Sequence, residues 1–171
     1  MAEKYSWDFQ SAKMPPADVL LEMYKKFVLG CPVKDVSVRG KSFSDLGWSG
    51  SSFLTFESRM KRAADSLTGS NWRWIEGGSE PLEAELDNAE LRDGYTLKKE
   101  FAFYNKASRG KVEGMFYLIR NALAHGSFRF HSTKGGEYFA FETRNNGRLR
   151  GRALLRISTL RAWQRILTGR I

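Results

Sequence analysis

The spacing of apolar residues along the chain changes near Gly126. Before this point apolar residues recur every three or four positions, and after it they alternate with polar residues. The first period is typical of helices that bury one face, and the second of strands that bury one face. The pattern therefore predicts a helical part followed by a small antiparallel sheet.

Four main helices are predicted before Gly126. Their approximate ranges are 15–29, 51–67, 97–106 and 111–125, and a short helix could follow Ser79. Pro15 and Pro16 are suited to the start of the first helix, and Ser51 or Ser52 to the cap of the second. Helices of this length favour an antiparallel bundle over about residues 15–125.

Three strands are predicted after Gly126, over 127–132, 138–143 and 148–155, in a β-meander of about 127–155. Its inner face is predicted to pack on the bundle and carries Phe128, Phe130, Phe139, Phe141, Leu149 and Ala153. Its outer face carries Arg129, His131, Tyr138, Glu142, Arg148, Arg150 and Arg152. A helix over 157–168 closes the chain. We therefore expect one mainly α domain over residues 1–171, a four-helix bundle with a three-stranded meander and a C-terminal helix.

Composition narrows the classes of function. The formal net charge is +9, and no acidic residue follows Glu142, although eight arginines do. Such a charge favours a polyanionic partner, and arginine can grip phosphate with two hydrogen bonds. On charge alone, however, a solvated basic surface is the simpler interpretation of this tail.

Several classes are disfavoured. Two histidines and one cysteine are too few for a zinc site of the usual kind, and Cys31 has no cysteine to pair with inside the chain. No apolar run approaches the roughly 20 residues that span a membrane, and MAEKYSWDFQ has no signal-peptide core. We expect a cytoplasmic protein without a metal, a cofactor or a membrane-spanning segment.

Arg120 and His125 are the candidate chemical pair. Both lie outside the apolar stripe predicted for the 111–125 helix, and Asn121 lies one turn before His125 and could contact it. Basic residues before a glycine are also an ordinary helix end, where the helix dipole stabilises them by roughly 0.3–1 kcal/mol. From spacing alone, the helix end is the better interpretation.

The motif nevertheless resembles the signature of the HEPN superfamily, an Arg, a polar residue, and a His four to six positions after the Arg. The surrounding IRNALAHGSFRF, the YFAFE strand, the RNNG turn and the STLRAW helix are similar to the plasmid-encoded HEPN ribonuclease-like family. This similarity covers roughly the C-terminal third. One departure is Ser127, because toxin members regulated by a nucleotidyltransferase partner often have a Tyr there.

The resemblance implies a four-helix bundle that dimerises around the motif and a metal-independent endoribonuclease with Arg120, Asn121 and His125 as catalytic residues. The chemistry suits these residue types. Attack of a ribose 2′-hydroxyl on the neighbouring phosphate needs proton transfer near neutral pH, which histidine can provide. Arg120 could stabilise the charge that develops on the phosphate, and Asn121 could orient His125 or contact phosphate. Phage defence, a toxin system or a stress response would be the setting.

Further contacts are predicted around this motif. Ala124 would let a second copy approach closely, so Tyr117 and Ala124 are predicted at the interface of a homodimer. The predicted RNA-binding residues are Arg129, His131, Arg148, Arg150 and Arg152. His131 could alternatively share the acid and base roles with His125, although a strand histidine is more often a surface residue.

Two other functions fit the same residues. The chain could be a catalytically silent RNA-binding module, or an interaction domain whose basic face meets an acidic protein. The expected partners of the preferred function are RNA, a second copy of the chain, and an antitoxin or other regulatory protein.

Overall fold

A computed structural model describes residues 2–36, 41–64 and 66–169. The elements in chain order are α1 (Ala17–Met23), a π-helical turn (Tyr24–Leu29), a 3-10 turn (Lys34–Val36), α2 (Ser52–Ala63), β1 (Trp72–Ile75), α3 (Ser79–Asn88), β2 (Phe101–Asn105), α4 (Lys111–Ala124), β3 (Phe128–Thr133), β4 (Gly136–Asn145), β5 (Arg148–Arg156) and α5 (Ile157–Leu167).

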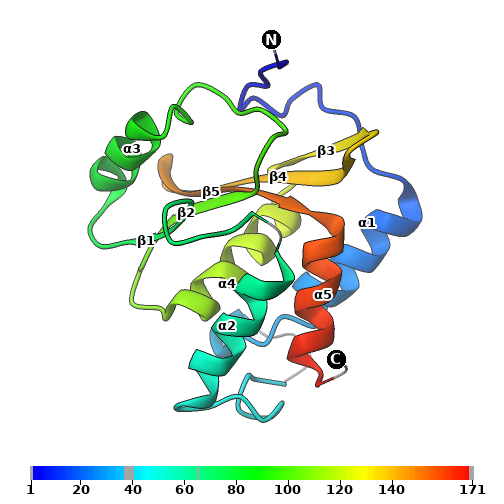
Figure 1. Cartoon of the computed structure of the whole chain (residues 1–171), viewed down its shortest axis with the longest axis vertical. Helices are drawn as coiled ribbons and strands as arrows, with labels where there is room; N and C mark the ends of the chain where they lie inside the picture. Colours follow the sequence, from blue (N-terminus) through cyan, green and yellow to red (C-terminus); the bar gives the residue numbers. More distant parts are fainter. Residues whose placement is uncertain (1, 37–40, 65, 170–171) are drawn as a thin grey trace.

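The strands form one five-stranded mixed sheet in the order β1-β2-β5-β4-β3. Only β1 and β2 pair in parallel; the other neighbours are antiparallel. Figure 1 shows α1, α2, α4 and α5 on one side of the sheet and α3 on the other. The fold is therefore α+β. The predicted mainly α four-helix bundle is wrong, and the three-stranded meander is only part of a larger sheet.

The error arose at the segment predicted as a helix over 97–106, which contains β2. All five residues of β2 are buried, because the strand lies between β1 and β5 and is covered on both faces. A strand buried on both faces loses the alternation of apolar and polar residues, so its sequence is hard to distinguish from that of a buried helix. β1 was missed as well, within a stretch that is polar on average.

The elements predicted after residue 110 are confirmed. α4 ends one residue before the predicted end, β3, β4 and β5 overlap the three predicted strands, and α5 occupies 157–167. The first helix also extends as predicted, because the turn after α1 continues to Leu29. Within the described ranges no helix is long and apolar enough to cross a lipid bilayer.

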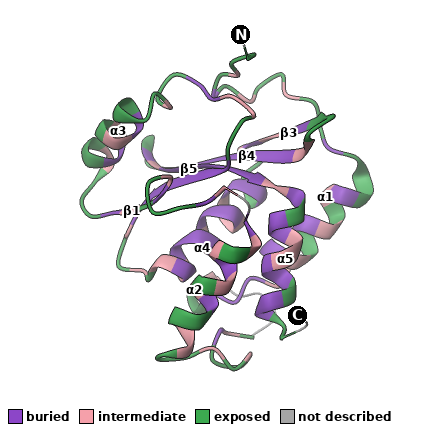
Figure 2. Ribbon diagram, in the orientation of Figure 1, coloured by how far each residue is buried: buried purple, intermediate pink, exposed green. Residues whose placement is uncertain are grey.

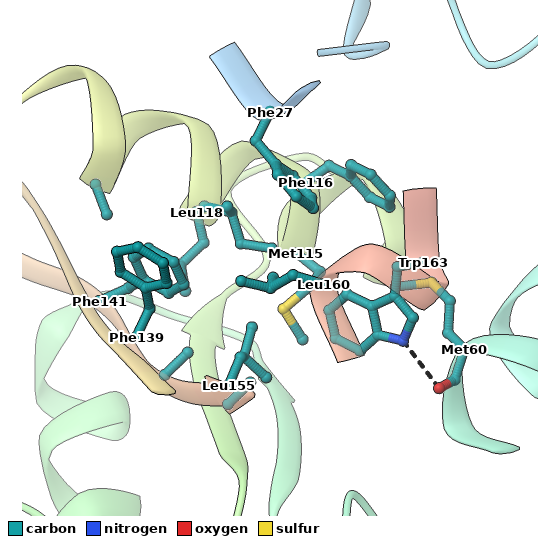
Figure 3. Close-up of a cluster of buried hydrophobic side chains, with 14 of the residues drawn as sticks. Phe27, Met60, Met115, Phe116, Leu118, Phe139, Phe141, Leu155, Leu160 and Trp163 are labelled. Atoms are coloured by element: carbon teal, nitrogen blue, oxygen red, sulfur yellow. Dashed lines mark hydrogen bonds between the residues drawn. The ribbon is translucent and has the colours of Figure 1, made fainter. Parts of the chain in front are cut away.

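The larger hydrophobic core lies between the sheet and the helices on its α4 side (Figure 2). Figure 3 shows its centre, with Phe27, Met60, Met115, Phe116, Leu118, Phe139, Phe141, Leu155, Leu160 and Trp163. The indole Nε1 of Trp163 donates to the carbonyl of Met60 at 2.9 Å and so ties α5 to α2. These contacts fix α4 against the sheet, and α4 carries the Arg120–His125 motif.

A second core covers the opposite face of the sheet, which had been predicted to be exposed. It contains Trp7, Ile75, Leu82, Leu86, Tyr95, Phe101, Phe103, Tyr138, Ala140, Leu149 and Leu154. The N-terminal segment contributes to it and is held by a backbone bridge between Tyr5 and Tyr95. Leu149, predicted on the inner face, lies on this side. The outer face of the meander is therefore covered by protein.

Candidate functional site

Two glycines let α4 lie directly on the sheet. A Cβ atom at Gly114 would lie 2.8 Å from the ring of Tyr104, and one at Gly151 would lie 2.6 Å from the side chain of Leu118. Both distances are shorter than carbon atoms tolerate. Any larger residue would push α4 away from β2 and β5, so these glycines set the position of the motif relative to the strands.

A cavity of about 560 Å³ opens beside α4. Its three walls are the outer side of α4, the loop from β2 to α4, and the ends of β4 and β5. The lining residues are Tyr104, Asn105, Lys106, Ala107, Ser108, Arg109, Gly114, Tyr117, Leu118, Arg120, Asn121, His125, Thr143, Arg144, Asn145 and Arg150. The structure thus brings Arg120, Asn121 and His125 together in one cavity, which we call the α4 pocket.

Arg120 is half-buried on the α4 wall. Its Nη1 donates to the side-chain oxygen of Asn121 at 2.8 Å, while its Nε is buried and has no hydrogen-bond partner among the described residues. A buried donor without a partner costs roughly 1–3 kcal/mol.

His125 and Asn121 have separate surroundings. The side-chain oxygen of Asn121 is engaged by Arg120, and within the described chain no hydrogen bond joins the Asn121 side chain to the His125 ring. His125 is exposed at the end of α4, where its backbone N–H donates to the carbonyl of Asn121. Gly126, at φ +69°, then reverses the chain. The imidazole of His125 is therefore accessible from the pocket.

The pocket is strongly cationic. Lys106, Arg109, Arg144 and Arg150 line it in addition to Arg120, and none of the lining residues is a carboxylate. Three of these cations have acidic partners outside the lining: Glu76 with Lys106 at 2.8 Å, Asp35 with Arg109 at 3.5 Å, and Glu142 with Arg144 at 2.8 Å. A concave surface with charge of one sign attracts anions.

The loop that forms the second wall has an uncommon backbone. Ala107 and Ser108 have φ angles of +46° and +62°, in the left-handed region that residues with a Cβ rarely adopt. The N–H of Arg109 donates to the carbonyl of Lys106 at 2.8 Å and closes this turn. The turn places Lys106 and Arg109 on the same rim. Sequence reasoning missed both residues, because it assigned Lys106 to a helix.

Arg129 and His131 do not lie in the pocket. They are on the face of β3 that looks toward the second core. His131 is only 8% exposed, lies 2.9 Å from the hydroxyl of Tyr95, and packs against the ring of Tyr5. Burial, helped by the charge of Arg129, lowers the pKa of His131 to about 4. Arg129 donates to the backbone carbonyl of Asp8 at 2.6 Å. Both side chains hold the N-terminal segment, so we no longer assign them to RNA binding.

Arg148, Arg150 and Arg152 were predicted to lie exposed on one face of β5, and this is wrong. Arg148 is exposed but outside the pocket lining, and Arg150 lines the pocket. Arg152 is buried, with Glu142 at 2.8 Å and the backbone carbonyl of Arg92 at 2.6 Å. Only Arg150 of the three is placed to contact a ligand in the pocket.

The two residues predicted at a dimer interface lie on different surfaces. Tyr117 lines the α4 pocket, with the guanidinium of Arg109 3.9 Å from the centre of its ring. Ala124 is exposed in a neighbouring groove that contains Met14, Leu21 and Tyr24. We call this surface the apolar groove.

Among the described residues, no three His, Cys, Asp or Glu side chains come together as metal ligands do. No family model matches the chain, and neither a curated protein nor a solved structure is significantly similar to it. None of these comparisons identifies a HEPN protein, and the four-helix bundle that the resemblance implied is not the fold of this chain.

Proposed function

We propose that the protein is a metal-independent endoribonuclease that cleaves RNA in the α4 pocket. The observation that carries the proposal is that Arg120, Asn121 and His125 share a cavity lined by four further cations and no carboxylate. Such a cavity suits a phosphodiester, and a volume of about 560 Å³ lies within the range of roughly 300–1,000 Å³ usual for ligand sites.

His125 is the proton acceptor in this mechanism. Its neutral imidazole takes the proton from a ribose 2′-hydroxyl, and the oxygen then attacks the adjacent phosphorus. The bond from phosphorus to the 5′-oxygen breaks, which leaves a 2′,3′-cyclic phosphate and a 5′-hydroxyl. The departing 5′-oxygen needs a proton, which the imidazolium formed in the first step can return.

Arg120 stabilises the negative charge on the non-bridging oxygens during this step. Its guanidinium lines the pocket, where it would face one of them, and Asn121 holds the guanidinium through the bond to Nη1. Asn121 is thus a positioning residue for Arg120. Its predicted contact with His125 is not part of this mechanism.

The wider setting belongs to the same proposal. RNA is the substrate, a second copy of the chain and an antitoxin or regulatory protein are partners, and the cytoplasm is the place of action. Phage defence, a toxin system or a stress response would employ such an enzyme.

The test is incubation of the purified protein with mixed cellular RNA in EDTA. We expect cleavage that leaves 2′,3′-cyclic phosphate or 3′-phosphate ends. His125→Ala and Arg120→Ala should each reduce the rate by about 100-fold or more, the usual range for loss of an acid–base group and of a charge-stabilising donor, respectively. His131→Gln, which alters the other histidine, should leave cleavage intact.

Three results would count against the proposal. Activity that EDTA abolishes and Mg²⁺ restores contradicts the mechanism. Cleavage by a folded His125→Ala variant places the active site elsewhere. RNA that is bound but never cut identifies the alternative of a silent RNA-binding module.

A further inference from the structure

A β-bulge moves Arg150 out of the regular alternation of β5. Thr143 of β4 pairs with Gly151, whereas the next residue, Arg144, pairs with Leu149. Arg150 is therefore the extra residue, without a partner in β4. Bulges bend a strand and re-aim a side chain, and they are frequent beside functional sites.

The residues on either side of the bulge indicate the direction of the Arg150 side chain. Leu149 belongs to the second core, while a Cβ at Gly151 would meet Leu118 of α4, so the two neighbours face opposite sides of the sheet. Arg150 lies between them and lines the α4 pocket. It has no ion pair with any described acidic residue, although Arg152 two positions later has Glu142.

The opposite rim is also cationic. Lys106 and Arg109 stand on the turn after β2, and their acidic partners are loosely held at the surface: the side chains of Glu76 and Asp35 are 81% and 74% exposed. Ion pairs of such exposed groups contribute little, so a phosphate can replace them. Arg120 and His125 thus lie in a pocket that has cations on two further walls.

Resting on the proposed function, we propose that Arg150 binds a second phosphate, next to the one that is cleaved. The substrate is then an internal position of an unpaired RNA strand that crosses the pocket between the β4–β5 hairpin and the β2–α4 turn. A mononucleotide has no second phosphate to offer. The cavity of about 560 Å³ has room for a nucleotide or two, so a single strand can enter it, whereas a duplex would lie across its mouth.

Arg148 provides a matched control, because it lies on the same strand two residues away, exposed and outside the pocket. The first measurement is binding of a fluorescent single-stranded RNA 12-mer to His125→Ala protein, which prevents cleavage, over a series of salt concentrations. Arg150→Gln should weaken binding about tenfold, as expected for loss of a hydrogen bond to a charged group. The slope of log affinity against log salt should become shallower by roughly 0.7. Arg148→Gln should change neither quantity, and Arg150→Lys should recover part of the affinity.

The second measurement uses the active protein. Arg150→Gln should lower kcat/KM more on a 12-mer than on a dinucleoside monophosphate, which has only the phosphate that is cleaved. Equal effects of Arg148→Gln and Arg150→Gln overturn the inference, as does equal affinity for a blunt RNA duplex. If wild-type protein never cuts RNA but Arg150→Gln alone weakens binding, the second phosphate site stands and the endoribonuclease does not.

Discussion

The two histidines differ in what surrounds them. His125 is exposed at the end of α4, whereas His131 is enclosed by Tyr5, Tyr95 and the core behind them. Sequence spacing placed both near the motif, six residues apart. It could not show that the sheet lies between them, because that separation depends on which face of β3 His131 occupies and on what covers that face.

His131 should make stability depend on pH. Burial lowers its pKa in the folded protein to about 4 from 6.5, so the unfolded chain binds the proton first as the pH falls. The contribution of His131 is complete above pH 6.5 and is lost between pH 6.5 and 4. Between pH 7 and 5 we expect the free energy of unfolding, measured with urea, to fall by about 2 kcal/mol on account of this residue.

The variant His131→Gln removes the titrating group and should show a smaller fall over this range. His125→Gln keeps His131 and should behave like the wild type. The same pH dependence in His131→Gln as in the wild type would show that other groups are responsible.

At the scale of elements, the start of α5 is held by a side chain that is distant in the sequence, Glu100. Glu100, immediately before β2, is fully buried, and its carboxylate accepts the backbone N–H of Arg156 at 3.1 Å and the hydroxyl of Thr159 at 2.9 Å. These two residues stand at the start of α5. The two oxygen atoms of Glu100 thus satisfy donors at the start of the helix.

Replacement of Glu100 by Ala should therefore destabilise the protein. We expect a loss of about 1–3 kcal/mol in the free energy of unfolding, since buried donors would be left without an acceptor. Glu80→Ala, at an exposed position in the first turn of α3, should stay within about 0.5 kcal/mol of the wild type. Urea titration of the two variants measures the difference. Equal stability would mean that α5 does not depend on this carboxylate.

Sequence reasoning predicted elements well where apolar residues recur with a clear period. The 111–125 helix and the strands of the meander had clear periods, and their ranges were confirmed. It failed at β2, where all five residues are buried. It placed a connection at 107–110 but could not show the left-handed backbone of Ala107 and Ser108, where no glycine indicates it. Because the strand and the backbone of the turn were not predicted, Lys106 and Arg109 were not recognised as pocket residues. Of the α4 pocket, the motif on α4 was therefore the main part that was predicted.

At the scale of the whole molecule, the apolar groove is the surface best suited to bind another protein chain. Met14, Leu21 and Tyr24 are 65%, 53% and 40% exposed, and they gather beside Ala124. Adjoining exposed apolar residues mark contact surfaces more often than scattered ones do. We propose that two copies associate through this groove about a twofold axis, close to His125.

Ala124→Glu should convert such a dimer to a monomer, because a charge would be buried in an apolar contact. Light scattering at micromolar concentration measures the mass. The control is Leu54→Asp, which changes an equally apolar side chain that is 70% exposed on α2 and should leave the dimer intact. A wild-type monomer contradicts the proposal, and a dimer that Ala124→Glu does not affect places the interface on another surface.

The overall architecture could not be predicted from local patterns. The sheet depends on pairing of β2 with β5, in which Ala102 stands opposite Ala153, about fifty residues away. The local sequence of neither strand indicates which other strand it pairs with. The assumption that successive helices pack on one another therefore led to a bundle.

Because the sheet lies between two cores, neither core can unfold without the other. Leu154 enters the core on the α3 side, and the next residue, Leu155, enters the core on the α4 side. β5 therefore belongs to both cores. If the helices on either side of the sheet came away, one face of β5 would be exposed to water and the core on the other face would lose its support. The two cores should melt together in a single cooperative transition, with the calorimetric and van't Hoff enthalpies equal.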